Sequence, residues 1–127
     1  MPVSTKAAAA EFGIGIIFNA SASGNPLRVL LDTGAQYGYL TSADLANGAE
    51  PAGIIHDFNP LLGEMESESW WVDVELCGIR FLERMGILPP MGAMPLAMLG
   101  VQAIIGCSWM HEHRLWLMPD ENRLAIS

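Results

Sequence analysis

The stretch that most constrains this chain is an aliphatic run that leads into an aspartate, VLLDTGA at residues 29–35. Leucine and β-branched residues ahead of a carboxylate predict a buried strand, and the Thr-Gly pair predicts the tight turn that ends it. A carboxylate at the end of a buried strand costs free energy unless a second group pairs with it or uses it. Asp32 is therefore either a turn aspartate or a functional group that requires a partner.

A second apolar block ends in a glycine in the same way. Residues 101–106 read VQAIIG, which predicts a strand ending at Gly106, and residues 107–111 predict a short helix. Trp109 and Met110 are the expected inward residues of that helix. The sequence holds no second Asp-Thr-Gly and no internal repeat.

Length and charge exclude several classes of protein. The 127 residues suit one compact domain, and the charged fraction of 16% is low, which predicts a large core or a surface that a second subunit buries. The formal net charge of −8 repels phosphate backbones and anionic lipids, so we expect no nucleic acid and no membrane as partners. The N-terminus lacks a signal-peptide pattern and no apolar run reaches membrane-spanning length, so the expected location is cytoplasmic or intracellular.

The cysteines and histidines do not predict a metal site. Cys77 and Cys107 have no CxxC spacing and are expected to be reduced core residues, with one optional disulfide as the alternative. His111 and His113 flank Glu112, but residues i and i+2 on a helix point apart, which favours a solvated helix over a metal site. We expect no metal and no cofactor.

The pattern of apolar, small and turn residues predicts a mostly β chain with one or two short helices. We expect a flexible leader at 1–10 and a single domain at 11–127. In the first half, we expect a strand at 11–20 with Phe12, Ile14, Ile16 and Phe18 on one face, a hairpin loop at 21–26, a strand at 27–31, a strand around 37–40, and a short helix at 43–46 capped by Thr41 or Ser42.

The second half predicts a long hairpin and a less regular apolar segment. The hairpin has arms at 51–58 and 64–76, and Glu64, Glu66 and Glu68 share a face that is expected to be solvated rather than to border a cleft that selects basic substrates. After the hairpin we expect a turn at Cys77-Gly78 and a strand at 79–81. Residues 83–100 predict strand pieces joined by apolar loop, with gap-filling core methionines at 85, 91, 94 and 98. A final hairpin is expected at 115–126.

Three segments give the chain its resemblance to a known family: LLDTGA at 30–35, LTSADLA at 40–46, and AIIGCSWM at 103–110 before the final hairpin. With these the chain resembles the retropepsin-like aspartic proteases of the single-domain, retroviral type. The resemblance implies an all-β fold, a small closed β-barrel with one or two short helices, which forms a C2 homodimer. It also implies that each subunit contributes one DTG loop and one flap hairpin.

Position by position, the resemblance implies a catalytic role for Asp32. The carboxylates of two subunits would share one proton, because like charges at hydrogen-bond distance cannot both ionise. Thr33, Gly34 and Ala35 would support the active-site loop: the Thr33 hydroxyl would join the two loops across the dimer, and Gly34 would allow a close backbone approach. Gly106 would be a structural glycine behind the catalytic loop.

The flap implied by the resemblance falls on the tip of the long hairpin, where turn residues gather. The flap candidates are Asn59, Leu61, Leu62 and Gly63. An ordinary surface hairpin is the alternative for this segment.

Together these patterns predict an aspartic endopeptidase that hydrolyses a peptide or protein substrate through a water activated by two copies of Asp32. One alternative is a catalytically inactive retropepsin-like module for dimerisation or peptide binding. A second alternative is a small β-barrel binding protein in which the DTG segment is only a turn.

Overall fold

The computed structural model describes residues 5–13, 15–60 and 62–127, which are mostly β-strand, as the sequence predicts. The strands are β1 (Lys6–Phe12), β2 (Ile16–Ala22), β3 (Asn25–Leu31), β4 (Gly38–Leu40), β5 (Glu50–Asn59), β6 (Gly63–Leu76), β7 (Ile79–Ile87), β8 (Ala103–Ile105), β9 (Leu115–Met118) and β10 (Arg123–Ile126). The helices are α1 (Pro90–Met98) and the short 3-10 helices η1 (Ala43–Ala46), η2 (Ser108–Glu112) and η3 (Pro119–Glu121).

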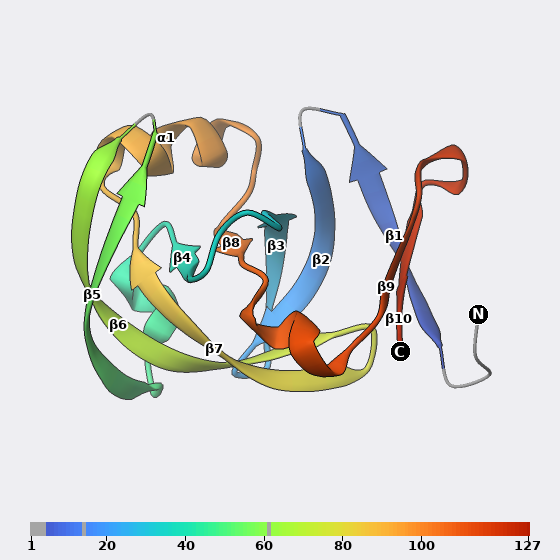
Figure 1. The fold of residues 1–127 in the computed structure, drawn as a ribbon, viewed down its shortest axis with the longest axis horizontal. Helices are drawn as coiled ribbons and strands as arrows, with labels where there is room; N and C mark the ends of the chain where they lie inside the picture. Colours follow the sequence, from blue (N-terminus) through green and yellow to red (C-terminus); the bar gives the residue numbers. More distant parts are fainter. Residues whose placement is uncertain (1–4, 14, 61) are drawn as a thin grey trace.

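Six of the strands close into a barrel (Figure 1). They are hydrogen-bonded in the order β6-β7-β4-β8-β3-β2, and β2 closes the ring by pairing with β6, where Ala22 lies opposite Val74. Alternate residues of β6 fill the interior, so that Val72, Val74 and Leu76 are buried. The prediction of a small closed β-barrel is confirmed.

The N-terminal strand pairs with the last strand of the chain. β1 lies between β10 and β2, with Lys6 opposite Ile126, and β9 pairs with the far side of β10. These strands form a sheet beside the barrel, at the right of Figure 1. The prediction of a flexible leader at 1–10 is therefore wrong for residues 6–10. The sequence did not indicate this strand, because a run of alanines shows no alternation between apolar and polar residues.

The single strand predicted at 11–20 is two strands separated by a turn. In that turn the Gly13 N–H donates to the Gly15 carbonyl oxygen at 3.1 Å. The two glycines contribute no side chain to either face of a strand, which favours a break at this point. The residues on both sides nevertheless alternate as they would in one continuous strand. Ile14, part of the predicted apolar face, lies outside the described residues.

Other turns lie where the sequence predicts them. Ser23-Gly24 joins β2 to β3, and Cys77-Gly78 joins β6 to β7, with positive φ at all four residues. Such two-residue turns match the twist of an antiparallel pair. Ser42 caps η1 by accepting a backbone N–H at 3.3 Å. The long hairpin is also present, formed by β5 and β6.

The segment 83–100 departs furthest from prediction. β7 continues to Ile87 and α1 follows it, in place of strand pieces joined by loop. Pro90 stands in the first turn of α1, where the missing proline N–H breaks no hydrogen bond. The helix has no polar face, so no amphipathic pattern marks it in the sequence. No helix in the part of the chain that the structure describes is long and apolar enough to cross a membrane.

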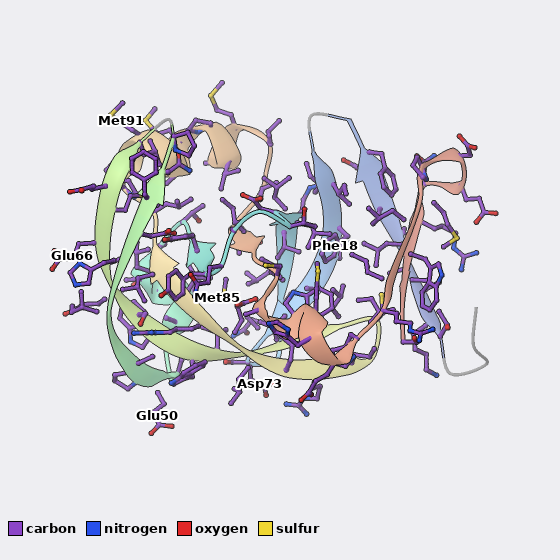
Figure 2. All side chains as sticks on the ribbon, viewed as in Figure 1. Phe18, Glu50, Glu66, Asp73, Met85 and Met91 are labelled. Carbon is purple, nitrogen blue, oxygen red and sulfur yellow. The ribbon has the colours of Figure 1, made fainter. Side chains whose placement is uncertain are left out.

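Three of the four methionines in this segment are on the surface. Met85 is 1% exposed in the barrel core, whereas Met91, Met94 and Met98 on α1 are 79%, 66% and 85% exposed. Met91 projects away from the barrel (Figure 2). The prediction of gap-filling core is confirmed for Met85 and wrong for the other three.

Candidate active site

The two apolar blocks of the sequence lie side by side in the barrel. β3 pairs in parallel with β8, with Leu31 opposite Ile105. The chain leaves β3 at Asp32, the first residue of the loop 32–37 that leads to β4 (Figure 1). The fold thus brings together the DTG and AIIG segments, which are far apart in the sequence.

Backbone hydrogen bonds fix the start of this loop. The Asp32 N–H donates to the Ile105 carbonyl oxygen at 2.9 Å, and the Ala35 N–H donates to the Asp32 carbonyl oxygen at 3.1 Å. The Gly34 N–H donates to Asp32 Oδ1 at 3.0 Å, and a Cβ on Gly34 would lie 3.4 Å from that oxygen. The bond from the Gly34 N–H orients the Asp32 side chain, and a Cβ at position 34 would make only ordinary van der Waals contact with it.

Gly106 lets the loop rest directly on the chain behind it. A Cβ on Gly106 would lie 2.6 Å from the Ala35 carbonyl oxygen and 2.9 Å from that of Tyr37. The Cys107 N–H donates to the same Ala35 oxygen at 2.9 Å, and Trp109 Nε1–H donates to the Gly106 oxygen at 2.7 Å. Only glycine fits at position 106 without moving the loop.

The side chains at the tip of the loop face solvent in the single chain. Asp32, Thr33 and Gly34 are exposed, and Ala35 is half-buried. The cost of burial expected for the Asp32 carboxylate therefore does not arise in one chain, because the strand is buried but the residue after it is not. Asp32 and Thr33 are accessible to another molecule.

The long hairpin is tied to the strand that follows the loop. The Tyr39 hydroxyl donates to the Asp57 carboxylate, and the Ile87 N–H donates to Ser67 Oγ at 2.9 Å. Burial raises the pKa of Tyr39 above its usual value, and the bond to Asp57 raises it further, so the hydroxyl keeps its proton. Arg84 donates to the backbone of β5 at 2.8 Å. The body of the hairpin is thereby held against the barrel.

The tip of the hairpin, which carries the flap candidates, lies beside α1 (Figure 1). Asn59 Oδ1 accepts the Leu62 N–H at 3.1 Å, and Gly63 has a φ of 78°, which favours glycine. A Cβ on Gly92 of α1 would lie 3.0 Å from the Leu62 side chain. Leu61, the remaining flap candidate, lies outside the described residues.

A groove of about 360 Å³ runs between this tip and the start of α1. Glu64 and Glu66 line it together with Met65 and Met91. These two glutamates and Glu68 are exposed, as predicted for a solvated face. Two of the three nevertheless border a groove.

A buried carboxyl group lies behind the loop and was not singled out from the sequence. Glu83 on β7 is 0% exposed, its Oε1 accepts the Ser108 hydroxyl at 2.8 Å, and its Oε2 has no hydrogen-bond partner in the described residues. Burial raises the pKa of Glu83 to about 7, against a smaller lowering by Ser108. Strand register is the signal that could have found it, because Phe81, Glu83 and Met85 share one face of β7.

The residues considered for a metal do not form a site. In residues 5–13, 15–60 and 62–127, no group of three or more His, Cys, Asp or Glu side chains is placed to hold an ion. His111 and Glu112 are exposed, and the His113 ring lies 6.0 Å from the Trp109 ring. Both cysteines are free.

No protein-family model matches the chain, and no curated protein is significantly similar to it. The motif and the geometry of the loop 32–37 are therefore the features that point to a function.

Proposed function

We propose that this protein is an aspartic endopeptidase that hydrolyses peptide bonds with a dyad of Asp32 residues from two subunits. The in-register pairing of β3 with β8 is the observation that supports this most, because it sets the end of the DTG strand against the AIIG strand. The resemblance to the retropepsin-like aspartic proteases implies that same arrangement. The closed barrel and the exposed loop agree with a fold of that type.

The chemistry requires two carboxyl groups that share one proton. The ionised carboxylate takes a proton from a bound water, and the oxygen of that water attacks the scissile carbonyl carbon. The protonated carboxyl donates to the carbonyl oxygen, which gives a neutral tetrahedral intermediate. Transfer of a proton to the amide nitrogen then lets the C–N bond break. The two groups titrate as a pair, so neither apparent pKa belongs to one residue.

Hydrogen bonding within the loop prepares Asp32 for this role. The Gly34 N–H donates to Oδ1, which leaves Oδ2 for the shared proton and the water. The backbone bonds from Asp32 to Ile105 and from Ala35 to Asp32 hold the loop without any side chain. The carboxylate is thereby positioned on a rigid support, as catalysis requires.

A second copy of the chain supplies the second carboxylate. One chain holds one DTG motif, and a C2 axis beside the loop would bring the two copies of Asp32 together. The exposure of Asp32 and Thr33 supports this assembly, because the groups that would meet the partner are accessible. Like-charge repulsion in the pair favours uptake of one proton, so dimerisation and protonation are coupled.

The substitution Asp32→Asn tests the proposal. Because an amide cannot take a proton from water, we expect cleavage of an unstructured peptide at mildly acidic pH to fall by about 10²- to 10⁴-fold. The matched control is Asp120→Asn, which changes an exposed aspartate in η3 and is expected to leave cleavage intact. Cleavage that survives Asp32→Asn would overturn the mechanism.

Peptide binding and sedimentation of the wild-type protein separate the alternatives. A wild-type protein that binds peptides but cleaves none at any pH would be an inactive dimerisation or peptide-binding module. A protein that sediments as a monomer at micromolar concentration and binds no peptide would be a small β-barrel binding protein with a DTG turn.

A further inference from the structure

Glu83 lies between the two segments that support the Asp32 loop. Its Cγ is 2.9 Å from the position that a Cβ on Gly38 would occupy, and Gly38 begins β4 directly after the loop. Its Oε1 accepts the hydroxyl of Ser108, the first residue of η2, which follows closely on Gly106. One side chain therefore packs against the end of the loop and bonds to the segment on which the loop rests.

The surroundings of this carboxyl group disfavour a charge. Glu83 is fully buried, its Oε2 has no partner among the described residues, and Val72 is its cross-strand neighbour on β6. A carboxylate with one oxygen that lacks a hydrogen-bond partner is unfavourable in an apolar interior, whereas a neutral carboxyl group is tolerated. Burial accordingly raises the pKa of Glu83 to about 7.

The charged and titratable side chains on the neighbouring elements are engaged or exposed elsewhere. Arg84 on β7 donates to the backbone of β5, and Asp73 on β6 pairs with Arg80. Tyr39 on β4 donates to Asp57. His111 and Glu112 on η2 are exposed, and the His113 ring lies near Trp109. Among the residues that the structure describes, the Ser108 hydroxyl is the side-chain group that hydrogen-bonds to Glu83.

We propose that Glu83 is a positioning residue for the Asp32 loop. Its neutral carboxyl group packs between β4 and η2 behind the loop, and its ionisation loosens that support, because the charge that then forms in the apolar interior costs more than the Ser108 bond returns. The effect on the loop is independent of the proposed peptidase activity, whereas its consequence for catalysis rests on that activity. A loop locked at mildly acidic pH suits a carboxyl dyad, which needs one shared proton.

The sign of the pH dependence follows from the direction of the pKa shift. The folded chain binds the Glu83 proton more tightly than the unfolded chain, so this group favours the folded state most below its ordinary pKa of 4.5. That advantage is lost as the pH rises toward about 7. The loop support is therefore strongest in acid and weakest above neutrality.

The test follows the backbone amide resonances of Ala35 and Gly106 by NMR from about pH 5 to about pH 8. The background is Asp32→Asn, which removes the loop's own carboxylate. We expect both resonances to move with a midpoint of about 7. We expect them to stay in place when Glu83→Gln is added, because the amide still accepts from Ser108 but cannot ionise.

The two proteins share every other titratable side chain, so the difference between them reports Glu83 alone. Resonances that stay in place in the first protein, or move equally in both, would overturn the proposal. Ser108→Ala gives a second readout that does not need the Glu83 variant to fold. Loss of the hydroxyl donor removes the bond that favours the carboxylate, so the midpoint should move to higher pH; an unchanged midpoint would contradict the proposal.

Peptide cleavage separates this inference from the proposed function. In an active enzyme, Glu83→Gln should raise the ratio of kcat/KM at about pH 7.5 to kcat/KM at about pH 6 severalfold over the wild type. Equal ratios in an active enzyme would refute the catalytic consequence. An absence of all cleavage, together with the expected amide titration, would refute the proposed function and support the role of Glu83.

Discussion

The Asp32 loop and the helix α1 are packed in opposite ways. The loop rests on backbone atoms, with the Ala35 and Tyr37 carbonyl oxygens so close to Gly106 that no side chain fits between them. The helix buries Leu96 and leaves three methionines exposed. Backbone contacts fix a position and side-chain contacts can adjust, so the loop is expected to be the rigid part of the molecule and α1 the adjustable part.

The same glycine-to-alanine change in the two regions gives the largest expected contrast. Gly106→Ala places a methyl group 2.6 Å from the Ala35 carbonyl oxygen, which cannot turn aside, so we expect a loss of about 3 kcal/mol or more in the free energy of unfolding. Gly92→Ala meets the flexible Leu62 side chain at 3.0 Å and adds helix propensity, so we expect a change of less than about 1 kcal/mol. Urea unfolding measures both values.

Equal costs at the two glycines would remove the distinction between a rigid loop and an adjustable helix. A small cost at Gly106 would mean that the loop can move away from β8. The support proposed for Asp32 would then be incorrect.

Methionine truncation sharpens the contrast at a smaller scale. Met85→Ala empties part of the barrel core and should cost about 2–5 kcal/mol. Met94→Ala removes an exposed side chain and should change the free energy of unfolding by less than about 0.5 kcal/mol in the single chain. Thermal unfolding at low and high protein concentration checks both. A large, concentration-dependent loss for Met94→Ala would show that a second copy covers α1.

The framework of the barrel was predictable because its signals are local. The apolar run at 27–31 predicts β3, and the Cys77-Gly78 pair predicts the turn after β6. The Ser42 hydroxyl predicts the cap of η1. β1 and α1 were missed because alanine-rich and uniformly apolar segments carry no periodic contrast. The break in the strand predicted at 11–20 lies between Gly13 and Gly15, where the chain turns so that Phe12 of β1 pairs with Ile16 of β2.

The candidate site was predictable in part for a similar reason. The motif identified Asp32 as the candidate residue, and Gly106 was expected to lie behind it. Glu83 was missed because the strand was expected to end at Phe81. Glu83 and Met85 were therefore not recognised as inward-facing residues of that strand. The solvent exposure of Asp32 depends on where the loop leaves the barrel, and no local pattern encodes that.

Mixing two versions of the chain tests the central claim, that one active site needs Asp32 from two subunits. Asp32→Asn protein is added in equal amount to wild-type protein under conditions where subunits exchange, and peptide cleavage is measured. Random pairing of subunits puts half of the wild-type chains into mixed dimers, so we predict that cleavage falls to about half. Addition of Asp120→Asn protein should cause no such fall. Cleavage that stays unchanged on addition of the Asp32→Asn protein would show that each chain acts alone, and would contradict the shared dyad.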